Sequence, residues 1–229
     1  MTTPTPTALA FLKKYGLKSR SEAVTNGVDT AVFRPMPHDK AIAKKYGLAD
    51  KPTLLYLGRV DGEKRLDLII KSLPEVLKHS DCQLVIAGFG NAMEDLKQLC
   101  AREGVAQNVI FTGFIDEADK PKIYNLSDIF IISSPAELQS IVTLEAMASA
   151  KPVIAVDVAA LHELVQNNKN GYLFDEDNYK MLAQKIILLI GNASKLKEFG
   201  QKSLDIIMKK HTTQITFNRY ESILEEISR

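Results

Sequence analysis

Two cations follow a short apolar stretch of the sequence, in the segment Gly58-Arg59-Val60-Asp61-Gly62-Glu63-Lys64. Gly58 ends a predicted strand, and Arg59 and Lys64 flank the start of the next predicted helix. Exposed backbone N–H groups and the positive end of a helix favour an anion. The Arg59 guanidinium adds a fork that matches phosphate oxygens, and the Lys64 ammonium adds a point charge. The natural ligand is a diphosphate, and the alternative is an ordinary strand-to-helix turn with two solvated cations.

Two glutamates form the second candidate site. Glu137 lies in a predicted loop after another apolar stretch, and Glu145 lies on the predicted helix that follows, with seven residues between them. Carboxylates suit hydroxyl-rich ligands because each can accept two hydrogen bonds from vicinal hydroxyls. The backbone amides of Gln139, Ser140 and Ile141 lie at the start of this helix and can bind oxygen atoms. The alternative is a helix with an acidic first turn and one solvated glutamate.

The segment Gly88-Phe89-Gly90 is a weaker signal. Two glycines after a strand either let the backbone approach a ligand or only make a tight turn. They are no dinucleotide fingerprint, because no third glycine and no acidic partner follow. The four histidines show no metal-ligand spacing, and the sequence contains neither a Ser/His/Asp triad nor a Walker-type loop. Cys82 and Cys100 show no redox spacing, so we interpret them as reduced core thiols.

A regular scaffold positions these candidates from residue 53 onward. Apolar stretches that predict strands alternate with apolar residues at helical spacing, which indicates βαβ units and a parallel sheet covered on both faces. We therefore predict an α/β fold, a Rossmann-like doubly wound parallel sheet, which binds ligands at the carboxyl ends of its strands. The predicted strands are 53–57, 83–87, 108–112, 128–132, 152–156 and 172–174, and the helices between them are 66–77, 93–100, 120–125, 142–150 and 161–165. Outside the sheet, the pattern predicts helices at 8–15, 179–190, 194–210 and 213–227 and a strand at 22–25.

Composition limits the class of protein. The chain has 229 residues, 45% hydrophobic and 25% charged, which excludes collagen-like, disordered and disulfide-scaffold proteins. A net charge of +1 argues against a nucleic-acid partner. No apolar run approaches the roughly 18 residues that span a bilayer. The N-terminus shows no signal-peptide pattern, so we expect a cytoplasmic protein.

Taken together, the motifs resemble the C-terminal, donor-binding domain of retaining glycosyltransferases of the GT-B fold, the glycosyl transferases group 1 family. The matching segments are LLYLGRVDGEKRLDLIIKSL, LVIAGFG, VIFTGFI and SSPAELQSIVTLEAMASAKPVIA, with NGYLF downstream. The resemblance runs from about residue 22 to the end. Arg65 and Ala150 stand where the family usually has glycine, and Gln139-Ser140 stands where it often has Phe-Gly, which leaves the donor sugar open.

The resemblance implies transfer of a hexose from a nucleoside diphosphate sugar with retention at the anomeric carbon. Arg59 and Lys64 would neutralise the leaving diphosphate, so neither a metal nor a cofactor is expected. Glu137 would contact hydroxyls of the donor sugar, and Glu145 would hold the ribose hydroxyls. The remaining donor contacts would come from the backbone around Gln139, Ser140 and Ile141, from Phe114 and Ile115 beside the base, and from Gly58, Gly88 and Gly90 along the cleft. A UDP-sugar is favoured on family frequency alone.

The resemblance also predicts three parts of the chain. Residues 1–32 would be a remnant of an acceptor domain and its linker, 33–210 the donor-binding domain, and 211–229 a crossover helix. About 25 residues precede the linker segment Asn26-Gly27-Val28-Asp29, whereas an acceptor domain needs more than about 100. We expect the acceptor domain to be absent from this chain, and the chain to be inactive alone.

The acceptor itself stays open. One candidate acceptor is a lipid at a membrane surface, which the absent domain would reach. Three alternatives to a transferase half also remain. The first is a non-catalytic nucleotide-sugar-binding subunit of a split enzyme. The second is an epimerase or phosphorylase of GT-B architecture, and the third is a flavodoxin-like regulatory domain.

Overall fold

A six-stranded sheet lies at the centre of the computed structural model, which describes residues 1–158 and 160–228. All neighbouring strands run parallel, in the order β5-β4-β3-β6-β7-β8. This confirms the doubly wound parallel sheet predicted from the sequence, and the direction of winding reverses between β3 and β6. The strands are β3 (Thr53–Leu57), β4 (Gln83–Ala87), β5 (Val109–Gly113), β6 (Ile129–Ile132), β7 (Val153–Val156) and β8 (Gly171–Phe174).

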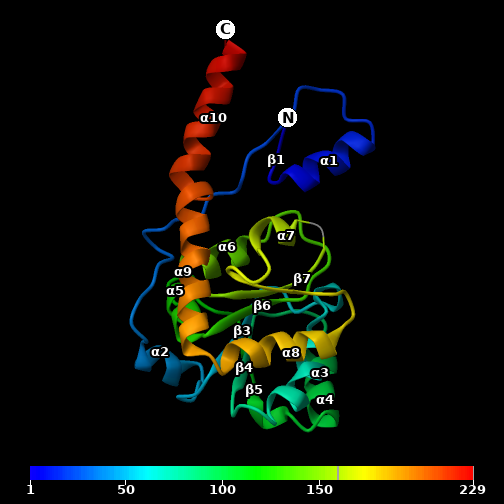
Figure 1. The fold of residues 1–229 in the computed structure, drawn as a ribbon, viewed down its shortest axis with the longest axis vertical. Coiled ribbons are helices and arrows are strands. Elements are labelled where there is room, and N and C mark those ends of the chain that lie inside the picture. The colour runs from blue at the N-terminus through cyan, green and yellow to red at the C-terminus, as the bar shows by residue number, and fades with distance from the viewer. Residues whose placement is uncertain (159, 229) are drawn as a thin grey trace.

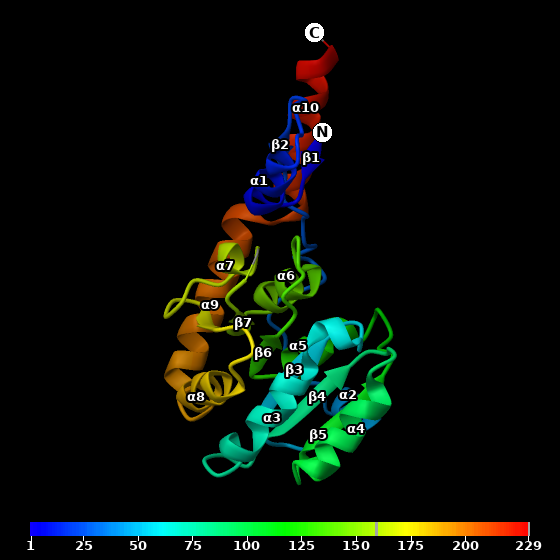
Figure 2. The ribbon, with the colours of Figure 1, turned by 90° about the vertical axis from the view of Figure 1, so that its right-hand side faces the viewer.

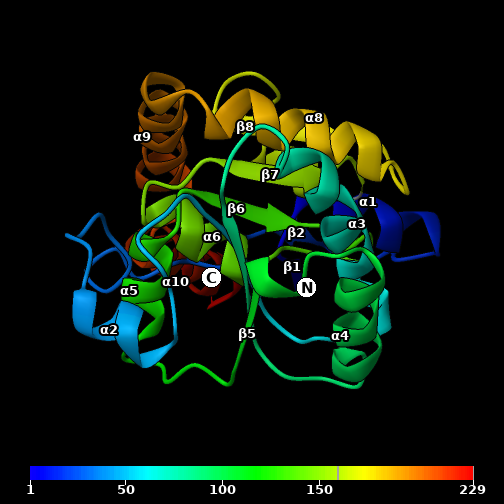
Figure 3. The same ribbon diagram turned by 90° about the horizontal axis from the view of Figure 1, so that it is seen from below.

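Helices cover both faces of the sheet, which explains why the strands are apolar throughout rather than alternating. On one face, α3 (Leu66–Val76) packs against α4 (Met93–Arg102) and α8 (Tyr179–Ile190). On the other, α6 (Ile141–Ala148) packs against α5 (Lys120–Leu126) and α9 (Ala193–Lys210). Figure 3 shows α3 and α4 on one side of the strands and α2 (Lys40–Lys45) and α5 on the other. Three short helical segments complete this part: η1 (Gly62–Lys64), η2 (Ala106–Asn108) and α7 (Leu161–Leu164).

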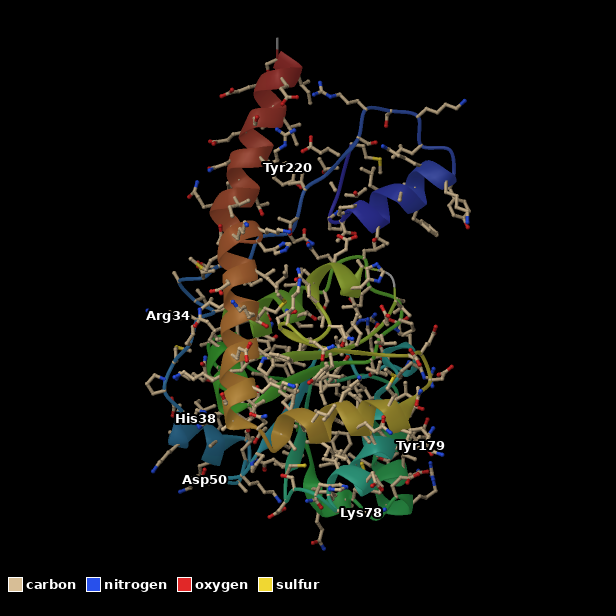
Figure 4. The ribbon with its side chains drawn as sticks, viewed as in Figure 1. Arg34, His38, Asp50, Lys78, Tyr179 and Tyr220 are labelled. Atoms are coloured by element: carbon tan, nitrogen blue, oxygen red, sulfur yellow. The ribbon has the colours of Figure 1, made fainter. Side chains whose placement is uncertain are left out.

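The N-terminal residues and the last helix form a separate projection away from the sheet (Figures 1 and 2). Strand β1 (Thr2–Thr3) pairs in parallel with β2 (Glu22–Ala23), and α1 (Pro6–Lys14) connects them. They lie beside α10 (Thr213–Ser228), to which they are tied by the ion pairs Arg219–Glu22 and Arg20–Glu226. No residue of α10 is buried, and Tyr220 stands out from it in Figure 4.

The structure differs from the sequence prediction at short elements. Helix α2 and strand β1 were not predicted, and the predicted strand 22–25 is reduced to the two residues of β2. Most other boundaries move by one or two residues, whereas β3, β4 and α8 match residue for residue. Residues 159 and 229 fall within two of the predicted parts of the chain and lie outside the described residues.

Two substitutions of family glycines lie in strained backbone. Arg65 has φ +52° and Ala150 has φ +55°, the left-handed region that favours glycine. The Arg65 side chain forms ion pairs with Asp67 and Asp177, which help to hold this conformation. The loop between β3 and α3 therefore keeps the backbone path that a glycine would allow.

The cysteines are isolated thiols, and the described residues contain no metal-binding cluster. Cys82 and Cys100 are buried free thiols, as predicted, and burial raises the pKa of each to about 11. Within residues 1–158 and 160–228, no group of three or more His, Cys, Asp and Glu side chains could hold a metal ion. No helix in the same ranges is both long and apolar enough to cross a membrane.

Candidate functional site

An ion pair joins the loops that follow the two central strands. Lys64 ends η1 after β3, and its Nζ lies 2.9 Å from Oε1 of Glu137 in the loop after β6. Both side chains are largely buried, with 14% and 16% of their surface exposed. The Ser134 Oγ lies 3.3 Å from the same Nζ, and Ser133 donates to the Lys64 carbonyl at 2.8 Å. The structure thus brings Lys64 and Glu137 together where the winding of the sheet reverses.

Arg59 lies on the same loop as Lys64 but points to solvent. Its guanidinium pairs with the carboxylates of Asp61 and Glu63, and 66% of its side chain is exposed. The backbone here is held by Tyr56, whose buried hydroxyl donates to the Arg59 carbonyl at 2.6 Å. Burial raises the pKa of Tyr56, so this phenol stays protonated and keeps its donor. Both predicted cations are therefore paired with carboxylates of the chain.

Glu145 lies inside the molecule on α6, where only 8% of the residue is exposed. Its Oε2 accepts a hydrogen bond from the Tyr124 hydroxyl at 2.7 Å. Burial raises the pKa of Glu145, and the Tyr124 hydrogen bond and the charge of Lys120 oppose that rise. Among the described residues nothing donates to Oε1, so this oxygen is available to a hydroxyl-bearing ligand.

A cavity of about 230 Å³ lies at the carboxyl ends of β3, β4 and β5. Five predicted residues line it, namely Gly58, Arg59, Gly88, Phe114 and Ile115. The other lining residues are Leu57, Ala87, Phe89 and Lys120. Phe89 and Phe114 are the two aromatic residues of this lining. Both rings are exposed, and such faces suit stacking on a flat ring. Lys64, Gly90, Glu137, Gln139, Ser140, Ile141 and Glu145 lie outside this lining.

Lys120 is the functional candidate that the sequence reasoning missed. It begins α5, lines the cavity and pairs with Glu117 at 2.6 Å. Its charge also lowers the pKa of Glu145, against the effect of burial. The available signal was a cation just after the third strand, at the same sheet edge as Lys64.

The glycine pair lets two loops pack backbone to backbone. Gly88 has φ +144°, and a Cβ there would lie 1.8 Å from the Gly58 carbonyl oxygen. A Cβ on Gly90 would lie 2.3 Å from the Val60 carbonyl oxygen. Close packing between the two loops therefore accounts for both glycines, and their contact with a ligand stays a prediction.

The loop before α6 contacts both the N-terminal linker and the first turn of the helix. The Gln139 side chain contacts the N-terminal linker, whereas Ser140 caps α6 by accepting from the Thr143 N–H at 3.3 Å. Within the described part of the chain, the backbone N–H groups of Ser140 and Ile141 donate to no acceptor, as expected in the first turn of a helix. Two of the three predicted oxygen-binding amides thus have no acceptor among residues 1–158 and 160–228.

Comparison with protein families and known sequences gives consistent matches. A family model described as "Glycosyl transferases group 1" matches residues 38–205. A GDP-mannose-dependent alpha-(1-6)-phosphatidylinositol monomannoside mannosyltransferase from Mycobacterium tuberculosis is 33% identical over 189 residues, 79% of this chain and 49% of the relative. An alpha-D-kanosaminyltransferase from Streptomyces kanamyceticus is 27% identical over 187 residues, 81% of this chain and 48% of the relative. The chain spans about half the length of both.

Solved structures share the fold. The C-terminal domain of a glycosyl transferase group 1 family protein, LpcC of Francisella tularensis, matches over 82% of this chain and 100% of its own, with 28% identity and a TM-score of 0.74. HepE of Anabaena, solved with UDP and glucose, matches over 98% of this chain and 62% of its own, with a TM-score of 0.89. Its identity is 22%, so this second likeness concerns the fold alone.

Proposed function

The chain belongs to the glycosyl transferases group 1 family, as its motifs predicted, and from that membership we propose that it binds the donor of a retaining hexosyltransferase. The donor is a nucleoside diphosphate sugar. In the reaction, the bond between the anomeric carbon and the diphosphate breaks, and a bond to an acceptor oxygen forms on the same face of the sugar. The Lys64–Glu137 pair, which joins the two central loops, is the observation that carries this proposal.

The diphosphate is proposed to take the place of the carboxylates that now pair with the two cations. Arg59 and Lys64 meet its oxygens and stabilise the charge that develops as it leaves. Once Lys64 turns to phosphate, Glu137 is released toward the sugar hydroxyls. The backbone N–H groups of Ser140 and Ile141 donate to no acceptor within the described part of the chain. They offer further hydrogen bonds to sugar or phosphate oxygens.

The nucleoside is proposed to fill the cavity and reach Glu145. The base stacks between the exposed rings of Phe89 and Phe114, with Ile115 at its edge. Glu145 Oε1 accepts hydrogen bonds from the ribose hydroxyls while Tyr124 occupies Oε2. The names of relatives point to UDP and GDP as candidate nucleotides, and the favoured donor remains a UDP-sugar.

Transfer is proposed to require an acceptor-binding domain, in the same polypeptide or in a separate one, because the chain spans about half the length of its relatives. In this proposal residues 1–32 belong to that domain and its linker, 33–210 bind the donor, and 211–229 cross back to the acceptor side. Any lipid acceptor or membrane contact would come through that domain. The chain by itself binds the donor without transferring it.

Calorimetric titration of the chain with UDP, GDP and ADP tests the proposal. We expect one nucleotide to bind, and Lys64→Met to weaken that binding at least tenfold, or about 1.4 kcal/mol. Lys78→Met is the matched control, since Lys78 follows the C-terminal end of α3, whereas Lys64 precedes its N-terminal end, and Lys78 pairs with Glu75 on the surface. Failure of all three nucleotides to bind the folded chain, or equal losses in both variants, contradicts the proposal.

A further inference from the structure

The side chain of Gln139 is committed to the N-terminal linker. Its Oε1 accepts from the Asn26 backbone N–H at 2.7 Å, and its Nε2 donates to the Thr25 Oγ1 at 2.8 Å. The Asn26 N–H can only donate, which fixes the orientation of the amide. The amide oxygen and one amide proton of Gln139 are therefore hydrogen-bonded to Asn26 and Thr25, more than a hundred positions away in sequence.

The linker that Gln139 contacts is itself fixed to the junction between α9 and α10. The Val28 N–H donates to the His211 carbonyl at 2.9 Å, and the Thr213 N–H donates to the Val28 carbonyl at 3.1 Å. Thr25 adds a side-chain contact, with its Oγ1 2.6 Å from His211 Nδ1. These hydrogen bonds hold the linker in one position, so the loop has a fixed point of attachment.

Glu137 lies between the fixed points of this loop. On one side, Ser133 donates to the Lys64 carbonyl at 2.8 Å. On the other, the Leu138 carbonyl accepts from Thr5 Oγ1 at 2.9 Å, and Gln139 holds the linker. Removing the Gln139 contacts would leave the Thr5–Leu138 hydrogen bond in place but would take away the second attachment of the loop, two residues beyond Glu137.

We propose that Gln139 is a positioning residue, which keeps the Glu137 carboxylate at the donor site beside Lys64 by fastening the loop of Glu137 to the linker. Its side chain does not touch the donor. The inference rests on the proposed function, because it concerns the carboxylate and the ammonium that meet the sugar and the diphosphate. Its consequence is selective: Gln139 affects the sugar and diphosphate part of the ligand and leaves the nucleoside part unaffected.

Paired titrations of the wild type and Gln139→Leu measure this selectivity. The probes are UDP-glucose and UMP, and GDP-mannose and GMP, of which the pair that binds the wild type is used. A nucleoside monophosphate reaches the cavity and Glu145 but carries neither the second phosphate nor the sugar. We expect Gln139→Leu to weaken sugar-nucleotide binding at least fivefold and to change monophosphate binding less than twofold. Gln201→Leu, on the surface of α9 beside Asp205, is the matched control and should change neither.

A second variant reports on the same contact without altering the loop. Thr25→Val removes the hydroxyl that accepts from Gln139, and should weaken sugar-nucleotide binding in the same selective way. The double variant with Gln139→Leu should bind no more weakly than Gln139→Leu alone, because the hydrogen bond between Thr25 and the loop is one of the two that Gln139→Leu already breaks.

The outcomes separate the two proposals. Equal losses for sugar nucleotide and monophosphate would show a general structural defect and overturn the positioning role. Unchanged binding of both ligands in Gln139→Leu and in Thr25→Val would overturn it as well. Wild-type binding of the monophosphate without tighter or equal binding of the sugar nucleotide would overturn the proposed function itself, independently of Gln139.

Discussion

Replacing His211 by asparagine should make the stability of the chain less sensitive to acid. His211 ends α9, and burial lowers its pKa from 6.5 to about 4, with the charge of Lys210 acting in the same direction and that of Glu163 opposing it. The folded chain therefore binds a proton on this ring less readily than the unfolded chain does. Stability is fully present above pH 6.5 and is lost as the pH falls toward 4.

The size of the effect follows from the two pKa values. With 6.5 in the unfolded chain and about 4 in the folded one, His211 costs about 2 kcal/mol of unfolding free energy between pH 7 and pH 5. The ring is not wholly shielded from water, which reduces the expected loss to between about 1 and 2 kcal/mol. In the His211→Asn variant, the side-chain oxygen can still accept from Thr25, but the group no longer titrates.

Urea unfolding at pH 7 and pH 5 measures this loss. Circular dichroism is the suitable signal, since the chain contains no tryptophan. The wild type should lose about 1 to 2 kcal/mol more than His211→Asn between the two pH values, whereas His79→Asn, at an exposed position, should behave like the wild type. Equal losses in the wild type and in His211→Asn would refute the reasoning, because carboxylates would then explain the whole pH dependence.

Two further substitutions test the packing and the electrostatics of the site. Gly88→Ala should destabilise the chain by about 3 kcal/mol or more, since the new Cβ would overlap the Gly58 carbonyl, while Gly62→Ala, with open space around it, should cost less than about 1 kcal/mol; urea midpoints compare them. Glu145→Gln should raise the melting temperature at pH 7, because burial raises the pKa of this carboxyl and its ionisation lowers stability as the pH rises through that value. The same variant should weaken nucleotide binding about tenfold by calorimetry, and a lower melting temperature with unchanged binding would contradict both expectations.

The central elements could be predicted because their burial is visible in the sequence. Strands β3 and β4 are continuous apolar stretches that end at glycines, since both faces of the sheet are covered. Helix α2 has six residues and depends on its Asp39 cap and on packing against α5, so it gives little periodic signal. Strand β1 has two residues and exists only through its pairing with β2.

The site was predictable as a set of positions but not as a set of contacts. Lys64 and Glu137 follow neighbouring strands, so a parallel sheet places them at one edge. The hydrogen bond from Tyr124 to Glu145 depends on how α5 packs against α6, and no local pattern encodes it. The contact of Gln139 with Asn26 joins residues 113 positions apart and depends on where the linker lies. The roles assigned to these residues remain predictions.

The chain enters and leaves the sheet domain at one place. Val28 on the way in and His211 and Thr213 on the way out are joined by backbone hydrogen bonds, and a Cβ on Gly27 would collide with Thr213. The two crossings therefore move as one. The two covalent connections of the intervening residues to the rest of the chain lie side by side, so recombination could exchange these residues between proteins without changing the separation of the flanking segments. Such an exchange would place a new sheet domain between the old flanking segments while leaving their junction intact.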